Sequence, residues 1–520
     1  MILYFLKKNN IFYTTAPYTY KKSENFMKNS LIRGTLILTL AGLITRFIGF
    51  FYRIFLANFL GEEQLGIYQL VLPLYSICFT IYGAGLQTAL SQLISGSKSS
   101  RQNGIIKAVL VLSISTAVTL SLFVFLKADW LAQKYFHEPQ AASLLQILSI
   151  LFPFCGISSM VNGYFYGKGN AKTPAISQII EQLARVTFVV CLSMTHVLFM
   201  TPKELAVAGI VTGEIVACLF NIRCTRQVLK DKERLEKQDY KDLLKLSLPL
   251  TGSRLVISFL SSLESILVPI TLRHYGCSSS DSLGFLGILS GVVMPFILFP
   301  SALTNSLSVL LLPSISKANS RGHTKTLRRQ GSRSIKFSLC LGLLSLSVFA
   351  NFGKELGLIL FHSERAGTLL VLLSVLCPFI YTTTTMESII NGLGKTLSTM
   401  NIHLIGLAIR ILSLLWVTPH LGPGGYLGGL ILSQLVICII CIFYLHHKLT
   451  FRFYAGSSLI LTFFFTYASI YTAHLLGNLL AEKTGFSYLV FVPLLFFLPG
   501  VLLYLARFNE IKWNAILPQR

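Results

Sequence analysis

The sequence predicts an all-α integral membrane protein with about fourteen transmembrane helices. Of its 520 residues, 53% are hydrophobic and 12% are charged, and the mean hydropathy is +0.67. Soluble domains average about 25% charged residues. Long apolar segments recur along the whole chain, and the second half of the sequence repeats features of the first. Together these observations indicate two pseudo-symmetric six-helix lobes followed by two further helices.

Fourteen segments are apolar and long enough to cross a bilayer core of about 30 Å as helices. Prolines inside such segments break or kink helices, so we expect irregular helices around Pro249, Pro269, Pro295 and Pro300. The predicted spans are 31–60, 66–94, 104–126, 141–166, 171–199, 204–226, 243–272, 283–314, 333–351, 366–392, 396–418, 424–447, 452–477 and 486–507.

The distribution of basic residues predicts the orientation of these spans. The N-terminal tail, every second connection and the C-terminus hold 32 of the 44 Lys and Arg residues, and the other connections hold 7. Cytoplasmic connections are enriched in Lys and Arg, so both termini are predicted to be cytoplasmic. The net charge of +24 therefore indicates membrane topology rather than nucleic-acid binding. The remaining five cations lie in the middle of spans, away from the span ends: Arg46, Arg53, Arg185, Arg254 and Arg410.

The ends of the chain and one long basic connection set the predicted domain limits. Residues 1–26 contain no apolar core of signal-peptide length, so we expect a disordered tail or a misassigned start before Met27. An N-lobe at 27–226 is followed by a basic cytoplasmic linker at 227–242. A C-lobe at 243–447 is followed by two helices and a cytoplasmic tail at 448–520.

The repeat is visible as dipeptides that occur in the same order in both halves. The pairs PF, NG and GK precede Arg185 in the first half and Arg410 in the second. Two similar segments, AGIVTGEIVAC and GGLILSQLVIC, place Glu214 opposite Gln434. Six helices return the chain to its starting side, so the repeats are parallel and a binding site is expected between them near the membrane midplane.

The first two spans carry a recognisable pattern. GTLIL, followed by TRFIGFFYRIFLANFLGEEQLGIYQLVLPLYS, resembles the stage V sporulation protein B branch of the polysaccharide transporters, from residue 27 to about 510. That branch belongs to the MOP superfamily, with the MATE exporters and the MurJ-type lipid II flippases. The resemblance implies a flippase in the bacterial cell membrane that carries an undecaprenyl-pyrophosphate-linked oligosaccharide to the outer leaflet. Lipid II or a related cell-wall or spore-cortex precursor is the implied substrate.

Two arginines of the first span are candidates for binding the pyrophosphate. Arg46 and Arg53 are seven residues apart, so they leave a helix on nearly the same side. A charge at the bilayer centre costs about 2.5–3.5 kcal/mol, and such residues normally face a bundle interior or a wet cavity. The resemblance implies a cavity role for both, although MurJ-type proteins space their pair one residue closer. Arg53 could instead extend to the outer interface.

Arg254 lies at the roughly equivalent position of the second lobe and is a third candidate. An arginine fork binds phosphate oxygens in pairs and stays charged at any depth. Ten residues further on, Glu264 shares roughly one helix face with it. Glu264 could therefore pair with Arg254 or bind a coupling ion. Glu214 and Glu387 are weaker candidates for proton or cation coupling.

A second arginine pair differs between the repeats. Glu181 precedes Arg185 by four residues, the favourable order for an ion pair within a helix, and a structural pair is the favoured interpretation. Arg410 is the repeat mate of Arg185 but has no Glu at that distance. It must pair elsewhere or line the cavity.

Other classes of function receive less support. No metal site, cofactor site or Walker A loop is indicated, and Cys438 and Cys441 lie inside an apolar run where sulfur side chains pack. A MATE-type cation-coupled drug exporter is one alternative, but an arginine-lined cavity would repel its substrates. A membrane-embedded glycan ligase or acyltransferase is another, but the outside loops are short. We expect a non-enzymatic protein that works as a monomer with its lipid-linked substrate, membrane lipids and possible Na⁺ or H⁺ coupling, without nucleic acid.

Overall fold

The computed structural model describes residues 21–96, 99–195, 200–230, 237–449 and 457–514, and these residues form helices and short connections without a β-strand. The first long helix, α2 (Lys21–Phe79), contains a kink at Gly61, where φ is 72°. Glycine tolerates this backbone conformation because it has no Cβ. The two halves of α2 correspond to two predicted spans, and the first already begins within the expected tail. Residues 1–20 of that tail lie outside the described residues.

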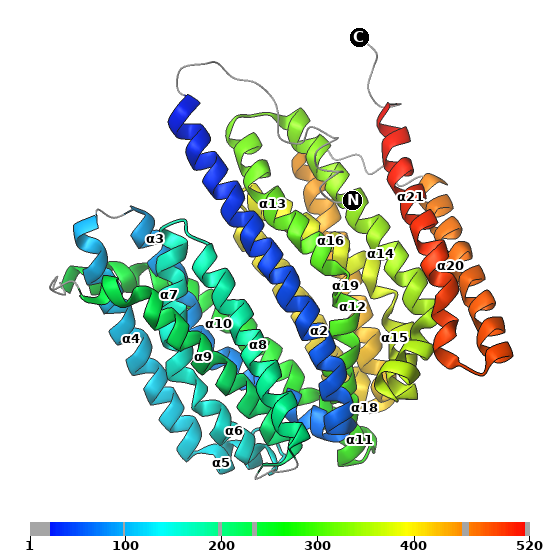
Figure 1. The fold of residues 1–520 in the computed structure, drawn as a ribbon, viewed down its shortest axis with the longest axis horizontal. Helices are drawn as coiled ribbons and strands as arrows, with labels where there is room; N and C mark the ends of the chain where they lie inside the picture. The colour runs from blue at the N-terminus through cyan, green and yellow to red at the C-terminus, as the bar shows by residue number, and fades with distance from the viewer. Residues whose placement is uncertain (1–20, 97–98, 196–199, 231–236, 450–456, 515–520) are drawn as a thin grey trace.

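Two groups of helices flank the first half of α2 (Figure 1). We call the first group the N-lobe, which consists of the second half of α2 and the helices from α3 to α9. The second group, the C-lobe, runs from α11 to α19. The N-lobe elements after α2 are η1 (Thr80–Ala84), α3 (Gly85–Gly96), α4 (Ser99–Leu126), α5 (Ala128–Lys134), α6 (Ala141–Ser149), α7 (Leu151–Gly167), α8 (Lys172–Met194) and α9 (Pro202–Lys230).

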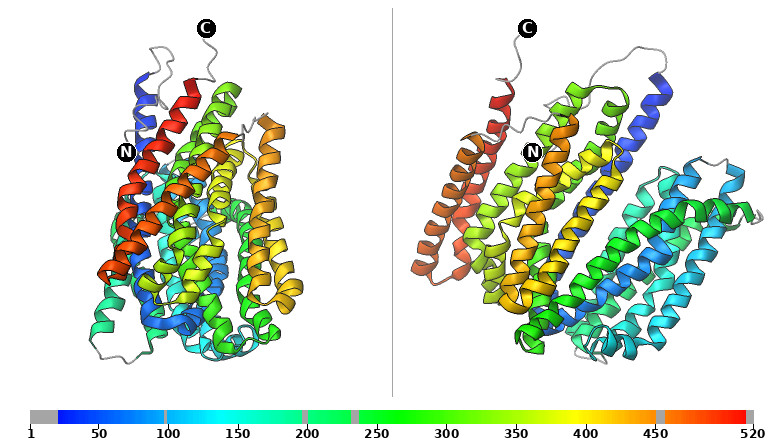
Figure 2. Two further views of the ribbon diagram at one scale, coloured as in Figure 1. Left: turned by 90° about the vertical axis from the view of Figure 1, so that its right-hand side faces the viewer. Right: turned by 180° about the vertical axis from the view of Figure 1, so that it is seen from behind.

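The C-lobe repeats this organisation and is followed by a helix pair at its edge (Figures 1 and 2). Its elements are α11 (Ser279–Leu286), η2 (Gly287–Val293), α12 (Met294–Leu298), α13 (Ser301–Ser320), α14 (Thr324–Phe361), α15 (Glu364–Leu373), α16 (Leu376–Gly392), α17 (Thr396–Leu412), η3 (Ser413–Val417), α18 (Thr418–Leu421) and α19 (Pro423–Leu449). The final pair consists of α20 (Ser457–Thr484), η4 (Ser487–Phe491) and α21 (Val492–Asn514).

Helix α10 (Lys237–Tyr275) belongs to neither lobe alone. Near its start, Leu243 is buried in an N-lobe cluster with Leu90 and Ile105, whereas near its end Glu264 contacts the C-lobe. The sequence division placed residues 237–242 of this helix in the linker and the rest in the C-lobe. Part of the predicted linker, residues 231–236, lies outside the described residues. The helix continues through Pro249 and Pro269, while the span predicted at 283–314 is divided among four elements.

The lobes meet at one end of the molecule and diverge toward the end that holds the start of α2 and the end of α21 (Figures 1 and 2). The hydrophobic clusters follow this shape. One large cluster joins buried residues of both lobes, such as Leu65 and Leu289. Away from that contact each lobe has its own cluster, around Leu90 in the N-lobe and Ile389 in the C-lobe. The lobes are therefore packed together at one end only.

The helices have the length and composition of membrane spans. Among the described residues, ten helices could cross a membrane, or up to twelve when each of two bent pairs counts as one span. One of the ten, Ile37–Gly96, covers most of two predicted spans because the chain turns back at Gly61. The span predicted at 452–477 corresponds to α20, which is not among the ten. The protein is a multi-pass all-α membrane protein.

Candidate functional site

The structure separates the five arginines inside the predicted spans into two groups. Arg185 and Arg410 each lie within salt-bridge distance of a glutamate. No carboxylate among the described residues pairs with Arg46, Arg53 or Arg254, whose side chains are exposed. The second group is the set that the sequence assigns to pyrophosphate binding.

The unpaired arginines come from α2 and α10, the two helices that lie between or cross between the lobes. Arg53 is within electrostatic reach of Tyr68 and of Arg185, a second cation. Arg254 Nη1 donates a hydrogen bond to the backbone carbonyl oxygen of Ala84, at a distance of 2.7 Å. This carbonyl belongs to the π-helical turn η1, so one guanidinium nitrogen is anchored while positive charge remains available to an anion.

The N-lobe places two carboxylates, Glu181 and Glu214, near Arg185. Glu181 and Arg185 form an ion pair within α8, as their spacing predicts. Glu214 of α9 is 8% exposed and lies against Ser158 and Cys155. Arg185 is therefore paired with Glu181 and lies within electrostatic reach of a second carboxylate, Glu214.

The C-lobe neutralises Arg410 across helices. Its Nη1 lies 3.4 Å from Oε1 of Glu264, whose side chain is 8% exposed. Tyr426 Oη also donates to this oxygen, at 2.9 Å. The suggested pairing of Glu264 with Arg254 is therefore wrong. Glu264 pairs with Arg410 of α17, and Arg254 binds a backbone carbonyl of η1. Because Glu264 is fully engaged, a salt bridge favours a structural role for it.

A second acidic contact in the C-lobe joins α16 and α17. His403 Nε2 lies 3.2 Å from Oε1 of Glu387. Sequence reasoning considered Glu387 but missed His403. The two residues are only sixteen positions apart, but they lie on different helices. Predicting their contact would have required placing the turn between these helices to within about one residue.

At the end of the molecule where the lobes meet, polar contacts join them. On α2 these contacts involve residues just after the kink at Gly61. Arg365 lies 3.4 Å from Glu62 through Nη1 and 3.1 Å from Asp281 through Nη2. Ser280 Oγ donates to Glu63 Oε2 at 2.6 Å. These contacts join the N-lobe half of α2 to α11 and α15. We call them the outer contact, and the sequence did not predict them.

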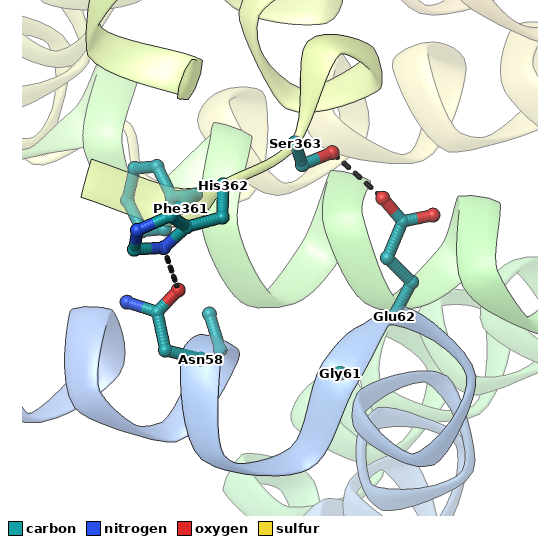
Figure 3. Close-up of a pocket in the computed structure, with 7 residues that line it drawn as sticks. Asn58, Gly61, Glu62, Phe361, His362 and Ser363 are labelled. Atoms are coloured by element: carbon teal, nitrogen blue, oxygen red, sulfur yellow. Dashed lines mark hydrogen bonds between the residues drawn. The ribbon is translucent and has the colours of Figure 1, made fainter. Parts of the chain in front are cut away.

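Figure 3 shows a surface pocket of about 470 Å³ beside the outer contact. Ser363 Oγ donates to Glu62 Oε1 at 2.6 Å, and Asn58 Oδ1 lies 3.0 Å from His362 Nδ1. Asn58 Nδ2 also donates to the carbonyl oxygen of Leu360 at 2.8 Å. The first half of α2 is thus tied to the end of α14, immediately before the kink.

Backbone packing at the outer contact relates the two repeats. A Cβ on Gly66 would lie 2.0 Å from the carbonyl oxygen of Leu283, and one on Gly287 would lie 2.4 Å from that of Glu62. The repeated Leu-Gly pairs at 65–66 and 283–284 therefore lie against each other where the helices cross. Only glycine allows this approach.

Comparisons with known proteins agree with this architecture. Residues 31–319, more than half of the chain, match the family described as Polysaccharide biosynthesis protein. The chain is 28% identical over 436 residues to Stage V sporulation protein B of Bacillus subtilis (strain 168), covering 79% of this chain and 83% of that protein.

Two solved structures share the fold. "Lipid II flippase MurJ, inward closed conformation" superimposes with a TM-score of 0.67 at 14% identity, covering 93% of this chain and 100% of that one. An inward-facing multidrug resistance MATE family transporter of the MOP superfamily gives a TM-score of 0.60 at 16% identity, covering 80% and 98%. This chain belongs to the polysaccharide biosynthesis protein family and has the fold of the MOP-superfamily transporters.

Proposed function

We propose that the protein is a flippase for an undecaprenyl-pyrophosphate-linked oligosaccharide, with lipid II or a related cell-wall or spore-cortex precursor as substrate. The observation that carries this proposal is the set of unpaired, exposed arginines Arg46, Arg53 and Arg254 on the helices between the lobes. Similarity to Stage V sporulation protein B and to a lipid II flippase supports it.

The arginines suit a pyrophosphate for three reasons. Their charge is permanent, their planar forks offer paired N–H donors, and no carboxylate in the described part of the chain pairs with them. A head group that enters between the diverging ends of the lobes would exchange part of its hydration for these donors. Its hydrocarbon chain would remain in lipid, so the protein only has to stabilise the polar part of the substrate inside the membrane.

Transport by alternating access requires the outer contact to open. The contacts of Arg365 with Glu62 and of Ser280 with Glu63 connect the lobes on the side opposite their diverging ends. They would have to break before the head group could leave toward the outer leaflet. The kink at Gly61 lies next to Glu62 and is the natural hinge for this movement.

This function places the protein in the bacterial cell membrane with both termini in the cytoplasm. The start of α2 and the end of α21 lie at the same end of the molecule, as this orientation requires (Figure 1). A reporter fused after Arg329 should then give a cytoplasmic signal, and one fused after Lys134 an outside signal. We infer that one chain is sufficient for transport, since both halves of the site come from it.

A MATE-type exporter of organic cations is the second candidate because the fold is shared. Three arginines without acidic partners would repel a cationic substrate, so this candidate is weaker. A membrane-embedded glycan ligase or acyltransferase would need a catalytic group on the outside. The described outside connections are too short to form a domain of their own.

Complementation tests the proposed substrate class. A bacterium depleted of its essential lipid II flippase should regain growth when this chain is expressed. The Arg46→Ala variant should not rescue growth at equal protein level. Absence of rescue by the natural sequence, with normal membrane insertion, would argue against lipid II and leave other lipid-linked sugars to be tested in the same way.

A further inference from the structure

The contact between His403 and Glu387 is a titratable pair that the transport scheme above does not use. The two side chains lie 3.2 Å apart and differ in accessibility: that of Glu387 is 16% exposed and that of His403 is 49% exposed. An imidazole with one buried acidic neighbour and one accessible side can take up and release a proton. The role of this proton depends on whether the accessible side of the imidazole faces lipid or the protein interior.

Helix α17 has one lipid-facing side and one side that faces the protein. Leu397, Ile405 and Leu412 are exposed and follow one side of the helix at its 3.6-residue period, as expected of a lipid-facing stripe. His403 lies on the opposite side, together with Arg410, which reaches Glu264 of α10. The imidazole is therefore exposed toward the protein interior, on the side where α10 crosses between the lobes.

Charged and titratable groups from four helices lie near this pair. Helix α16 contributes Glu387, and α17 contributes Arg410, seven residues beyond His403. Helix α10 contributes Glu264, which already pairs with Arg410. Helix α19 contributes Cys441, which lies near Glu387. Arg410 is thus committed to another acid, and His403 is the group that can balance Glu387.

We propose that His403 and Glu387 form a proton-binding site on the side of α17 that faces α10, the helix that crosses between the lobes, and that its protonation adds a fourth positive charge for the anionic substrate. Nε2 is the ring nitrogen placed 3.2 Å from the Glu387 carboxylate, so we assign the hydrogen of the neutral imidazole to Nε2. Nδ1 then takes up the second proton from water between the diverging lobes, and the product is an imidazolium beside a carboxylate. No other reagent is consumed.

Proton and substrate are then linked. If protonation of His403 strengthens binding of an anion, the bound anion must strengthen proton binding by the same factor. Release of the head group on the outer side would favour release of the proton. This second part rests on the proposed function, whereas the proton site itself does not.

Nitrogen NMR of ¹⁵N-histidine-labelled full-length protein in detergent tests the proton site directly. His403→Gln identifies the resonance, Glu387→Gln removes the acidic partner, and His447→Gln, at an exposed position at the end of α19, is the matched control. We expect the His403 resonance to titrate between about pH 5 and 9, with a lower midpoint in Glu387→Gln. A resonance that does not titrate in this range, or an unchanged midpoint, would overturn the proposal.

Equilibrium binding of undecaprenyl pyrophosphate at pH 6 and pH 8 tests the link to the anion. The natural sequence and His447→Gln should bind undecaprenyl pyrophosphate at least about 5-fold more tightly at pH 6 than at pH 8. His403→Gln should lose this difference and keep its affinity at pH 8. An equal pH effect in His403→Gln would contradict the link. Absence of binding by the natural sequence would count against the proposed function, while the NMR titration would still decide the proton site.

Discussion

The two lobes carry arginines at equivalent positions but neutralise them in different ways. Arg185 pairs with Glu181 within its own helix, α8. Its repeat mate Arg410 pairs with Glu264 on a different helix, α10. The first pair connects nothing beyond one turn of helix, whereas the second attaches the crossing helix to the C-lobe. Both repeats therefore have an arginine at this position, but the arginine joins different parts of the structure in each lobe.

The second carboxylate of each lobe shows the same divergence. Glu214 of the N-lobe lies against neutral Ser158 and Cys155, and its repeat mate in the C-lobe is the neutral Gln434. In the C-lobe the corresponding charge is carried by Glu387 from another helix and faces His403. Pseudo-symmetry thus describes the backbone, while the polar interior differs between the lobes.

Removing Glu264 should have the largest effect on stability. Glu264→Gln leaves the Arg410 guanidinium without its acidic partner, and breaking a buried pair in this way costs about 3–5 kcal/mol. Thermal unfolding in detergent should show a clearly lowered midpoint. The double variant Glu264→Gln with Arg410→Gln should regain part of the loss because no charge then remains unpaired. A single variant as stable as the natural sequence would refute the role of this pair.

Weakening the outer contact should have a smaller effect on stability but a visible one on conformation. Arg365→Ala removes two exposed ion pairs, and such pairs contribute little to stability because water and salt screen them. Distances between spin labels at Lys134 and Glu364 should show a larger outward-open population. Lys354→Ala, on the same side without an ion pair among the described residues, is the control. Identical distance distributions in both variants would remove the outer contact from the scheme.

Breaking the N-lobe pair should have the smallest effect. Glu181→Gln removes a contact within one helix, and such pairs contribute about 0.2–0.5 kcal/mol. Arg185 then remains within electrostatic reach of Glu214, whereas Arg410 loses its only salt bridge among the described residues in Glu264→Gln. The midpoint of thermal unfolding of Glu181→Gln should lie close to that of the natural sequence and well above that of Glu264→Gln. If the two variants were equally destabilised, the lobes would not differ in the way described above.

Much of the fold was predictable because membrane spans need long apolar segments and because the repeat is written in local motifs. Arg46, Arg53 and Arg254 could be singled out as candidates because a charge in an apolar segment is visible without knowing its neighbours, and their binding role stays a prediction. Partners were not. Arg410 finds Glu264 across 146 positions, and Glu62 finds Arg365 across 303 positions. Such pairings follow from how helices pack, which local patterns do not encode.

The central claim is that the unpaired arginines bind the pyrophosphate, and flipping of fluorescent lipid II by protein reconstituted in liposomes tests it most directly. Arg46→Ala should abolish flipping with normal insertion, since removing a membrane-embedded charge eases insertion. Arg46→Lys should recover only part of the activity because it lacks the paired donors. Arg53→Ala should be equally severe if that side chain meets the head group. Flipping by Arg46→Ala at the rate of the natural sequence, with equal protein in the membrane, would contradict the account.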